Sequence, residues 1–190
     1  MKEEITFMQD DVWQKARAQY YKVMQEEPPE KVDCTIEQLT AFKHLLDTHR
    51  VPYADFAIFG KYMKRLLKKH ALVGFFFDLA GGLRKFELFG PPNVYAWVES
   101  YEVLTTILLM LDAVPRPLLN HYRDFIIDLA RTYGETTWPL LYQAEVRNRS
   151  ERMPILRIKA IKDHQAAITA QRHSDFDVDR PWDKVWAMCI

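Results

Sequence analysis

The chain has 190 residues, 48% of them hydrophobic and 27% charged, which predicts a globular domain and excludes a disordered chain. Its 26 basic and 26 acidic side chains balance, so no overall charge indicates a nucleic-acid or membrane partner, and any such surface must be local. The sequence has no signal peptide, no membrane-spanning run and only two distant cysteines, Cys34 and Cys189, so we expect an intracellular protein without disulfides or a cysteine metal site.

Residues 1–30 are expected to form an N-terminal helical arm. Between Asp10 and Gln25, apolar side chains recur on one helical face, and Asp10 or Asp11 is a candidate cap. The acidic stretch 26–30 then contains two adjacent prolines, which end a helix and favour extended backbone. We expect this arm to pack on the body of the protein or on a neighbouring subunit.

The expected core domain spans residues 31–172 and opens with a short helix. Thr35 and Gln38 have the spacing of a capping box, and Pro52 predicts a helix end near His49. The segment 61–70 then carries five cations and no acid: Lys61, Lys64, Arg65, Lys68 and Lys69. Two interpretations stay open, a solvated helix face and a surface for RNA, DNA or an acidic partner.

A β-hairpin is predicted at about residues 72–89. Two runs rich in Phe, Leu and Val flank Gly81 and Gly82, and such a pair supplies the positive φ that a tight turn requires. The mixed pattern of the second run is consistent with one covered face. An isolated two-stranded hairpin is marginally stable in water, so we expect it to lean on the helices or to pair with another chain.

A central buried helix is predicted at about residues 93–114. Apolar residues recur there in alternating steps of three and four, and from Val103 to Leu111 only two threonines interrupt them. Asn93 is the expected cap, and Pro115 ends the helix. Leu108, inside the most apolar stretch, is expected to be fully buried.

Two further helices are predicted, from Pro117 to Tyr133 and from about Thr136 onward. The second should be kinked or broken at Pro154, because proline lacks an N–H and its ring clashes with the preceding turn. Beyond Pro154 apolar residues become sparse, so residues 155–172 are expected to project from the core. Three arginines of this long helix join the candidate nucleic-acid surface: Arg147, Arg149 and Arg152.

Residues 173–190 are expected to form an acidic tail that contains two tryptophans. Its alternating acids at positions 175, 177 and 179 lack the glycine and the terminal glutamate of a calcium loop. Trp182 and Trp186 are four residues apart and share one face of a helix, which favours a docking segment. We expect them, with Phe176, to form an oligomer interface as an arm exchanged between subunits, so that truncation after His173 shifts the protein toward monomer.

No sequence motif indicates catalysis. The chain lacks GxSxG, HExxH, CxxC and Walker signatures, and none of its three serines has a histidine and an acid at helical spacing. We therefore expect no catalytic residue, no cofactor and no small-molecule substrate. Two alternatives to an assembly module stay open, a helical protein–protein adaptor and an enzyme whose site is assembled from dispersed residues.

Aromatic and proline landmarks occur in three strings, VPYADFAIFGKYMKRLLKK (51–69), FELFGPPNVYAWVESYEVLTTILLMLDAV (86–114) and YGETTWPLLYQAEVRNRSERM (133–153). In these landmarks the sequence resembles a recurrent domain of retroelement-like proteins in dinoflagellate genomes. The resemblance covers about residues 35–155 and carries over no site residue. In its gag-like interpretation it implies a capsid-like domain that assembles around RNA. We thus expect a mainly α-helical, non-catalytic single domain that forms homo-oligomers, offers a local basic surface to RNA or DNA and has no membrane partner.

Overall fold

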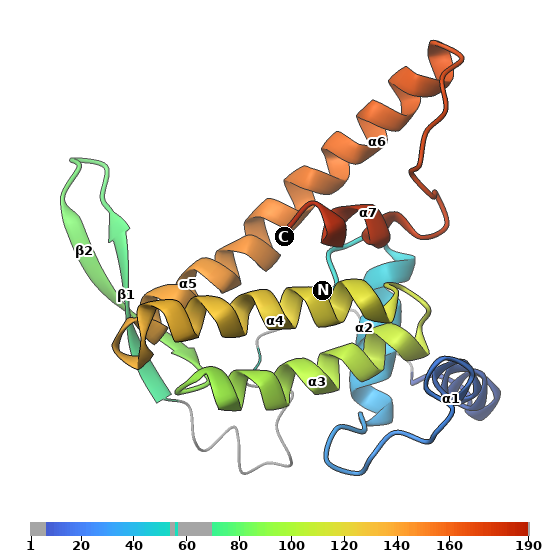
Figure 1. Ribbon diagram of the computed structural model, residues 1–190, viewed down its shortest axis with the longest axis horizontal. Helices are drawn as coiled ribbons and strands as arrows, with labels where there is room; N and C mark the ends of the chain where they lie inside the picture. Colours follow the sequence, from blue (N-terminus) through green and yellow to red (C-terminus); the bar gives the residue numbers. More distant parts are fainter. Residues whose placement is uncertain (1–6, 54–55, 57–69, 190) are drawn as a thin grey trace.

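The computed structural model describes residues 7–53, 56 and 70–189 (Figure 1). Its helices are α1 (Asp10–Met24), α2 (Ile36–Asp47), α3 (Val94–Met110), α4 (Arg116–Tyr133), α5 (Trp138–Arg147), α6 (Met153–Thr169) and α7 (Pro181–Ala187). Strands β1 (His70–Phe77) and β2 (Leu83–Gly90) form an antiparallel hairpin. A 3₁₀ turn (Glu135–Thr137) precedes α5, and a π-turn (Asn148–Arg152) joins α5 to α6. This architecture confirms the predicted class, mainly α-helical with one hairpin.

Helix α3 is the central helix, with α1, α2 and α4 packed against it. The Asn93 side chain caps it by accepting a hydrogen bond from the Ala96 N–H at 2.9 Å, and Leu108 is fully buried, as predicted. The helix ends before the predicted Val114 because Asp112 takes a left-handed φ of 49°. The Ala113 N–H then turns back to the Leu108 carbonyl at 2.9 Å, which closes the C-terminal turn.

Stacked aromatic rings connect α3 to α4 and to α7. Trp97 and Tyr101 stack with ring centroids 4.8 Å apart, and Tyr101 stacks on Tyr122 at 5.8 Å. Tyr122 in turn meets the edge of Trp186 at 6.2 Å. The Tyr101 hydroxyl donates to the Leu119 carbonyl at 3.0 Å, so its polar end is satisfied inside the core.

The N-terminal arm packs on the body of its own chain. Ala16 and Tyr20 of α1 are buried, and Arg17 ties α1 to the following connector through Glu27 and Asp33, each at 2.9 Å. The predicted cap is wrong, since Gln9 occupies the N-cap without a side-chain bond while Asp10 and Asp11 fall in the first turn.

The capping box of α2 is confirmed, with the Gln38 side chain accepting from the Thr35 N–H at 2.9 Å. This helix ends at Asp47, two residues before the predicted end, because His49 adopts a positive φ of 56°. Ahead of Pro52 the chain has therefore already left the helix.

The long C-terminal helix is not broken at Pro154. The π-turn lies just before this proline, and within it the Met153 N–H bonds to the Asn148 carbonyl five residues back. One extra residue in the turn widens it, so the helix continues past the proline ring with a local change of winding. Figure 1 shows α5 and α6 following each other along nearly one line, with α6 projecting from the body and residues 170–180 returning beside it.

Candidate interaction surfaces

The predicted basic surface is only partly within the described structure. Five of its cations lie outside the described residues: Lys61, Lys64, Arg65, Lys68 and Lys69. Arg147 and Arg152 are exposed, and Arg147 forms an ion pair with Glu151 at 3.2 Å. The assignment of Arg149 to this surface is wrong, because its side chain is only 1% exposed and its guanidinium cannot reach a phosphate.

Arg149 instead forms an ion pair inside the core. Its Nε and Nη2 donate to the two carboxylate oxygens of Glu145, the second at 2.9 Å, and the Glu145 side chain is itself fully buried. The guanidinium carbon lies 4.0 Å from the ring centre of Phe56 and 4.8 Å from that of Tyr53. Burial alone would lower the pKa of Arg149, but the charge and hydrogen bonds of Glu145 outweigh it and raise the pKa above its usual value. Arg149 therefore keeps its positive charge.

A sequence signal for this pair exists and was missed. Trp138, Tyr142, Glu145 and Arg149 follow one another in steps of four, three and four, so they share one helical face. Trp138 and Tyr142 are buried on that face, with their rings stacked at 5.9 Å. The two charges continue an apolar stripe, and this placement, more than residue type, predicts burial.

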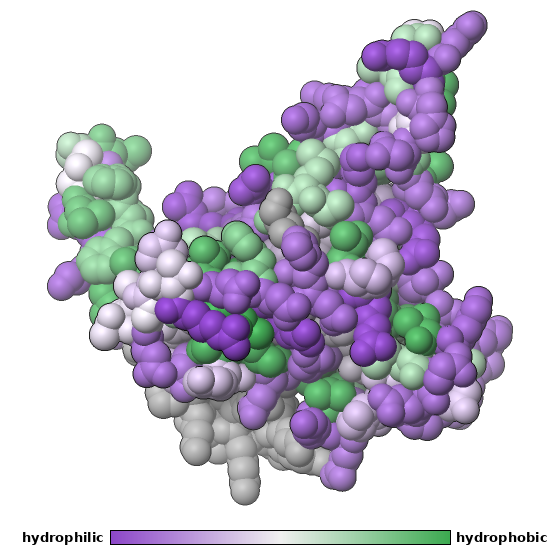
Figure 2. Space-filling view, in the orientation of Figure 1, coloured by the Kyte–Doolittle hydropathy of each residue, from purple (hydrophilic) through white to green (hydrophobic). Residues whose placement is uncertain are grey.

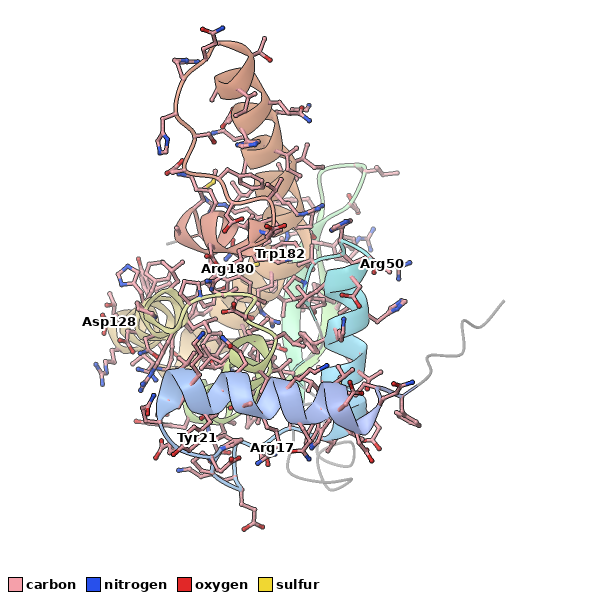
Figure 3. All side chains as sticks on the ribbon, turned by 90° about the vertical axis from the view of Figure 1, so that its right-hand side faces the viewer. Arg17, Tyr21, Arg50, Asp128, Arg180 and Trp182 are labelled. Carbon is pink, nitrogen blue, oxygen red and sulfur yellow. The ribbon has the colours of Figure 1, made fainter. Side chains whose placement is uncertain are left out.

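The tail is covered by its own chain. Trp182 and Trp186 are buried, with the Arg157 guanidinium 5.6 Å from the Trp182 ring centre, and Phe176 packs on the His164 ring at 5.3 Å. Figure 3 shows Trp182, with Arg180 beside it, where the tail meets the helical body. The expected interface residues are thus not exposed in this structure, and no exchange between copies is required to shield the tryptophans from water.

A serine–histidine contact that the sequence did not indicate holds the tail against α6. The Ser174 hydroxyl lies 2.8 Å from His164 Nδ1 and accepts the Phe176 N–H at 3.3 Å. A catalytic pair would require an acid that orients the histidine, and within the described residues no carboxylate bonds to His164. The contact joins the tail to α6.

An apolar groove of about 510 Å³ lies between α4 and the α5–α6 helix. Phe125, Leu129 and Leu141 line it together with Arg147 and Arg152. The two exposed arginines of the predicted basic surface are thus brought to one groove, where the acidic Glu151 also lies.

Seven of the eighteen large apolar side chains that are exposed among the described residues lie on the hairpin. Its base, which here means the part from His70 to Phe75 and the strand opposite, is held by α5. The Gln143 side chain bonds to both the N–H and the C=O of Phe75, and the Trp138 indole donates to the Pro91 carbonyl at 2.8 Å. Gly90 lies so close to the Tyr142 ring that a Cβ there would be 2.0 Å from it. Beyond this base the hairpin leaves the body.

Beyond Phe75, both faces of the hairpin carry exposed apolar side chains. In the observed register Phe77 pairs with Leu83 on one face, and these side chains are 75% and 60% exposed. Phe76 and Phe86 lie edge to face at 6.1 Å on the other face and are also exposed. Figure 2 shows this segment as a largely hydrophobic arm standing away from the body. The expectation of one covered face is therefore wrong beyond the base.

Among the described residues, no cluster of three or more His, Cys, Asp or Glu side chains has the arrangement of a metal site. Nor does any helix in the described ranges combine the length and apolar character needed to cross a membrane. Comparisons of the chain with models of known families, with curated proteins and with solved structures found no match.

Proposed function

We propose that this chain is a non-catalytic self-assembly module that also offers a local basic surface to RNA or DNA. The exposed apolar hairpin carries the proposal. A soluble monomer rarely leaves a contiguous group of large apolar side chains in water, and such a group typically marks an interface. Here the group is made of Val73, Phe76, Phe77, Leu79, Leu83 and Phe86, all on one projecting segment.

The physics of small sheets supports the same conclusion. Two strands alone gain little stability in water, and three or more strands, or a covering helix, are needed for a stable sheet. Helix α5 supplies such cover at the base, through Gln143 and Tyr142. Beyond Phe75 the described part of the chain leaves Phe76, Phe77 and Leu83 exposed, so a partner would complete the sheet there.

The nucleic-acid component of the proposal has support mainly from sequence. The segment 61–70 has five cations without an acid, and Arg152 adds an exposed cation on the C-terminal helix. Arg149 is excluded from this surface by its burial. A cluster of this kind attracts phosphates by charge, without sequence specificity.

The groove between α4 and the α5–α6 helix favours a second candidate, a protein–protein adaptor. Its apolar lining and two arginines suit an amphipathic helix with acidic flanks. In this alternative the chain stays monomeric and binds a different protein.

The proposal is tested by measuring mass in solution with analytical ultracentrifugation at several concentrations. The wild-type mass should rise with concentration, and the double variant Phe77→Ser/Leu83→Ser should remain monomeric. The matched control is Tyr95→Ser/Ile155→Ser, which removes two apolar side chains of similar exposure, 72% and 65%, from helix surfaces. A wild type that is monomeric throughout, or a hairpin variant that associates as the wild type does, would refute the proposal.

A further inference from the structure

The outer edge of β2 offers unpaired backbone groups. Gln143 bonds to the N–H and C=O of Phe75, so these groups point away from β2. Lys85 is the partner of Phe75 in the antiparallel register, so its own N–H and C=O point away from β1, as do those of Leu83 and Glu87 at alternate positions. Within the described residues, these three positions have no hydrogen-bond partner on that edge.

We infer that the β2 edge pairs with β2 of a second copy, antiparallel and around a twofold axis at Phe86. This inference rests on the proposed self-assembly and specifies its geometry. The register places Lys85 opposite Glu87 of the second copy and Glu87 opposite Lys85 of the second copy. Each of these pairs joins residues whose backbone groups point outward, so each exchanges two backbone hydrogen bonds, and four central bonds form.

Charge selects this register over its neighbours. A twofold axis at position 85 would set Lys85 against its own copy, and an axis at position 87 would do the same for Glu87. Like charges directly opposite destabilise a strand pair, whereas opposite charges stabilise it. Arg84 is already engaged by Asp78 at 2.8 Å, so Lys85 and Glu87 are the charges that decide the alignment.

The same pairing brings together the apolar surface of both hairpins. A four-stranded sheet results, with Phe76 and Phe86 of each copy near the axis on one face. The face with Lys85 and Glu87 also carries the exposed Phe77–Leu83 pair of each copy. One symmetric contact thus gives the sheet four strands, pairs opposite charges and brings the exposed apolar side chains of both hairpins together.

Cysteine cross-linking tests the register. At the axis, Phe86 and its copy form a non-hydrogen-bonded pair with Cα atoms about 4.5 Å apart, within the range that a disulfide spans. Oxidised Phe86→Cys protein should therefore form covalent dimers. Arg84→Cys is the control, since its copies would lie four residues apart along the strand, about 13 Å, and should not cross-link. Wild-type protein, whose Cys34 and Cys189 are buried, gives the background.

Charge reversal provides a second measurement that leaves Phe86 in place. Lys85→Glu and Glu87→Lys should each weaken self-association about ten-fold, because two attractive pairs become repulsive. The double variant Lys85→Glu/Glu87→Lys should restore it. Association unaffected by the single changes, or cross-linking at position 84 in place of 86, would overturn this register while the proposed self-assembly stood. A wild type that is monomeric in ultracentrifugation would overturn both, and association that requires a different protein would favour the adaptor.

Discussion

The buried Glu145–Arg149 pair allows a quantitative test of the core. Arg149→Met keeps most of the side-chain length but leaves the Glu145 carboxylate without its partner in a site that is 0% exposed. Removing one member of a buried pair costs about 3–5 kcal/mol, because the remaining charge is desolvated without compensation. For a domain with about 5–15 kcal/mol of total stability this loss is large. With a urea dependence of about 2 kcal/mol per molar, the midpoint should fall by about 1.5–2.5 M.

The double variant Glu145→Leu/Arg149→Met separates desolvation from packing. It removes both charges and fills the space with apolar atoms, so its stability should return to within about 1 kcal/mol of the wild type or exceed it. The exposed pair Arg147–Glu151 on the same helix is the control, and Arg147→Met should cost less than about 1 kcal/mol. Urea unfolding followed by tryptophan fluorescence measures all four proteins. A loss below about 1 kcal/mol for Arg149→Met, or a double variant as unstable as the single one, would refute the buried-pair argument.

Four further predictions follow from the core, the tail, the thiols and the basic segment. Leu108→Ala should lower the free energy of unfolding by about 2–5 kcal/mol in urea melts, since the side chain is fully buried in α3. Truncation after His173 should lower the thermal midpoint, because it removes Trp182 and Trp186 from the core, and an unchanged midpoint would contradict their burial. Burial raises the pKa of Cys34 to about 12 from an ordinary value near 9.0. The stability that this thiol contributes below pH 9 should therefore be lost as the pH rises toward 12, and the free energy of unfolding should fall more steeply with pH in the wild type than in Cys34→Ala. The logarithm of RNA affinity, measured by filter binding, should fall with the logarithm of salt concentration by a slope of about −0.7 per phosphate contacted. Binding should disappear, with the helical circular dichroism signal unchanged, when four cations are changed to glutamate: Lys64, Arg65, Lys68 and Lys69.

Local signals in the sequence were sufficient to predict most of the helices and the hairpin. The capping box at Thr35 and the Asn93 cap act over three residues, and the alternating threes and fours of α3 need no knowledge of its neighbours. Helix ends were less predictable. Asp112 and His49 take positive φ values that their residue types permit without requiring, so the chain turns earlier than the prolines suggested.

The candidate sites depended on contacts between distant segments, which spacing does not encode. Trp182 and Trp186 were correctly assigned to one face, but the acceptor of that face, Tyr122 for Trp186, lies on α4, about sixty residues earlier. Arg149 was assigned to the surface with the other cations of the C-terminal helix, and its aromatic neighbour Phe56 comes from a segment far from it in sequence. Sequence predicted the hairpin itself, whereas its projection from the body follows from how little of it α5 covers.

The π-turn between α5 and α6 fixes how many residues the chain must have at this point. It holds one residue more than a regular helical turn, so it offsets the faces of α6 from those of α5 by about 100°. With this offset Met153 and Ala160 point inward while Ile155 and Ile158 point outward. Deletion of a single residue, Ser150 for example, would restore ordinary winding and rotate every later side chain of α6 by that angle. A one-residue deletion here would therefore disturb the packing of α7 and the rest of the tail against α6.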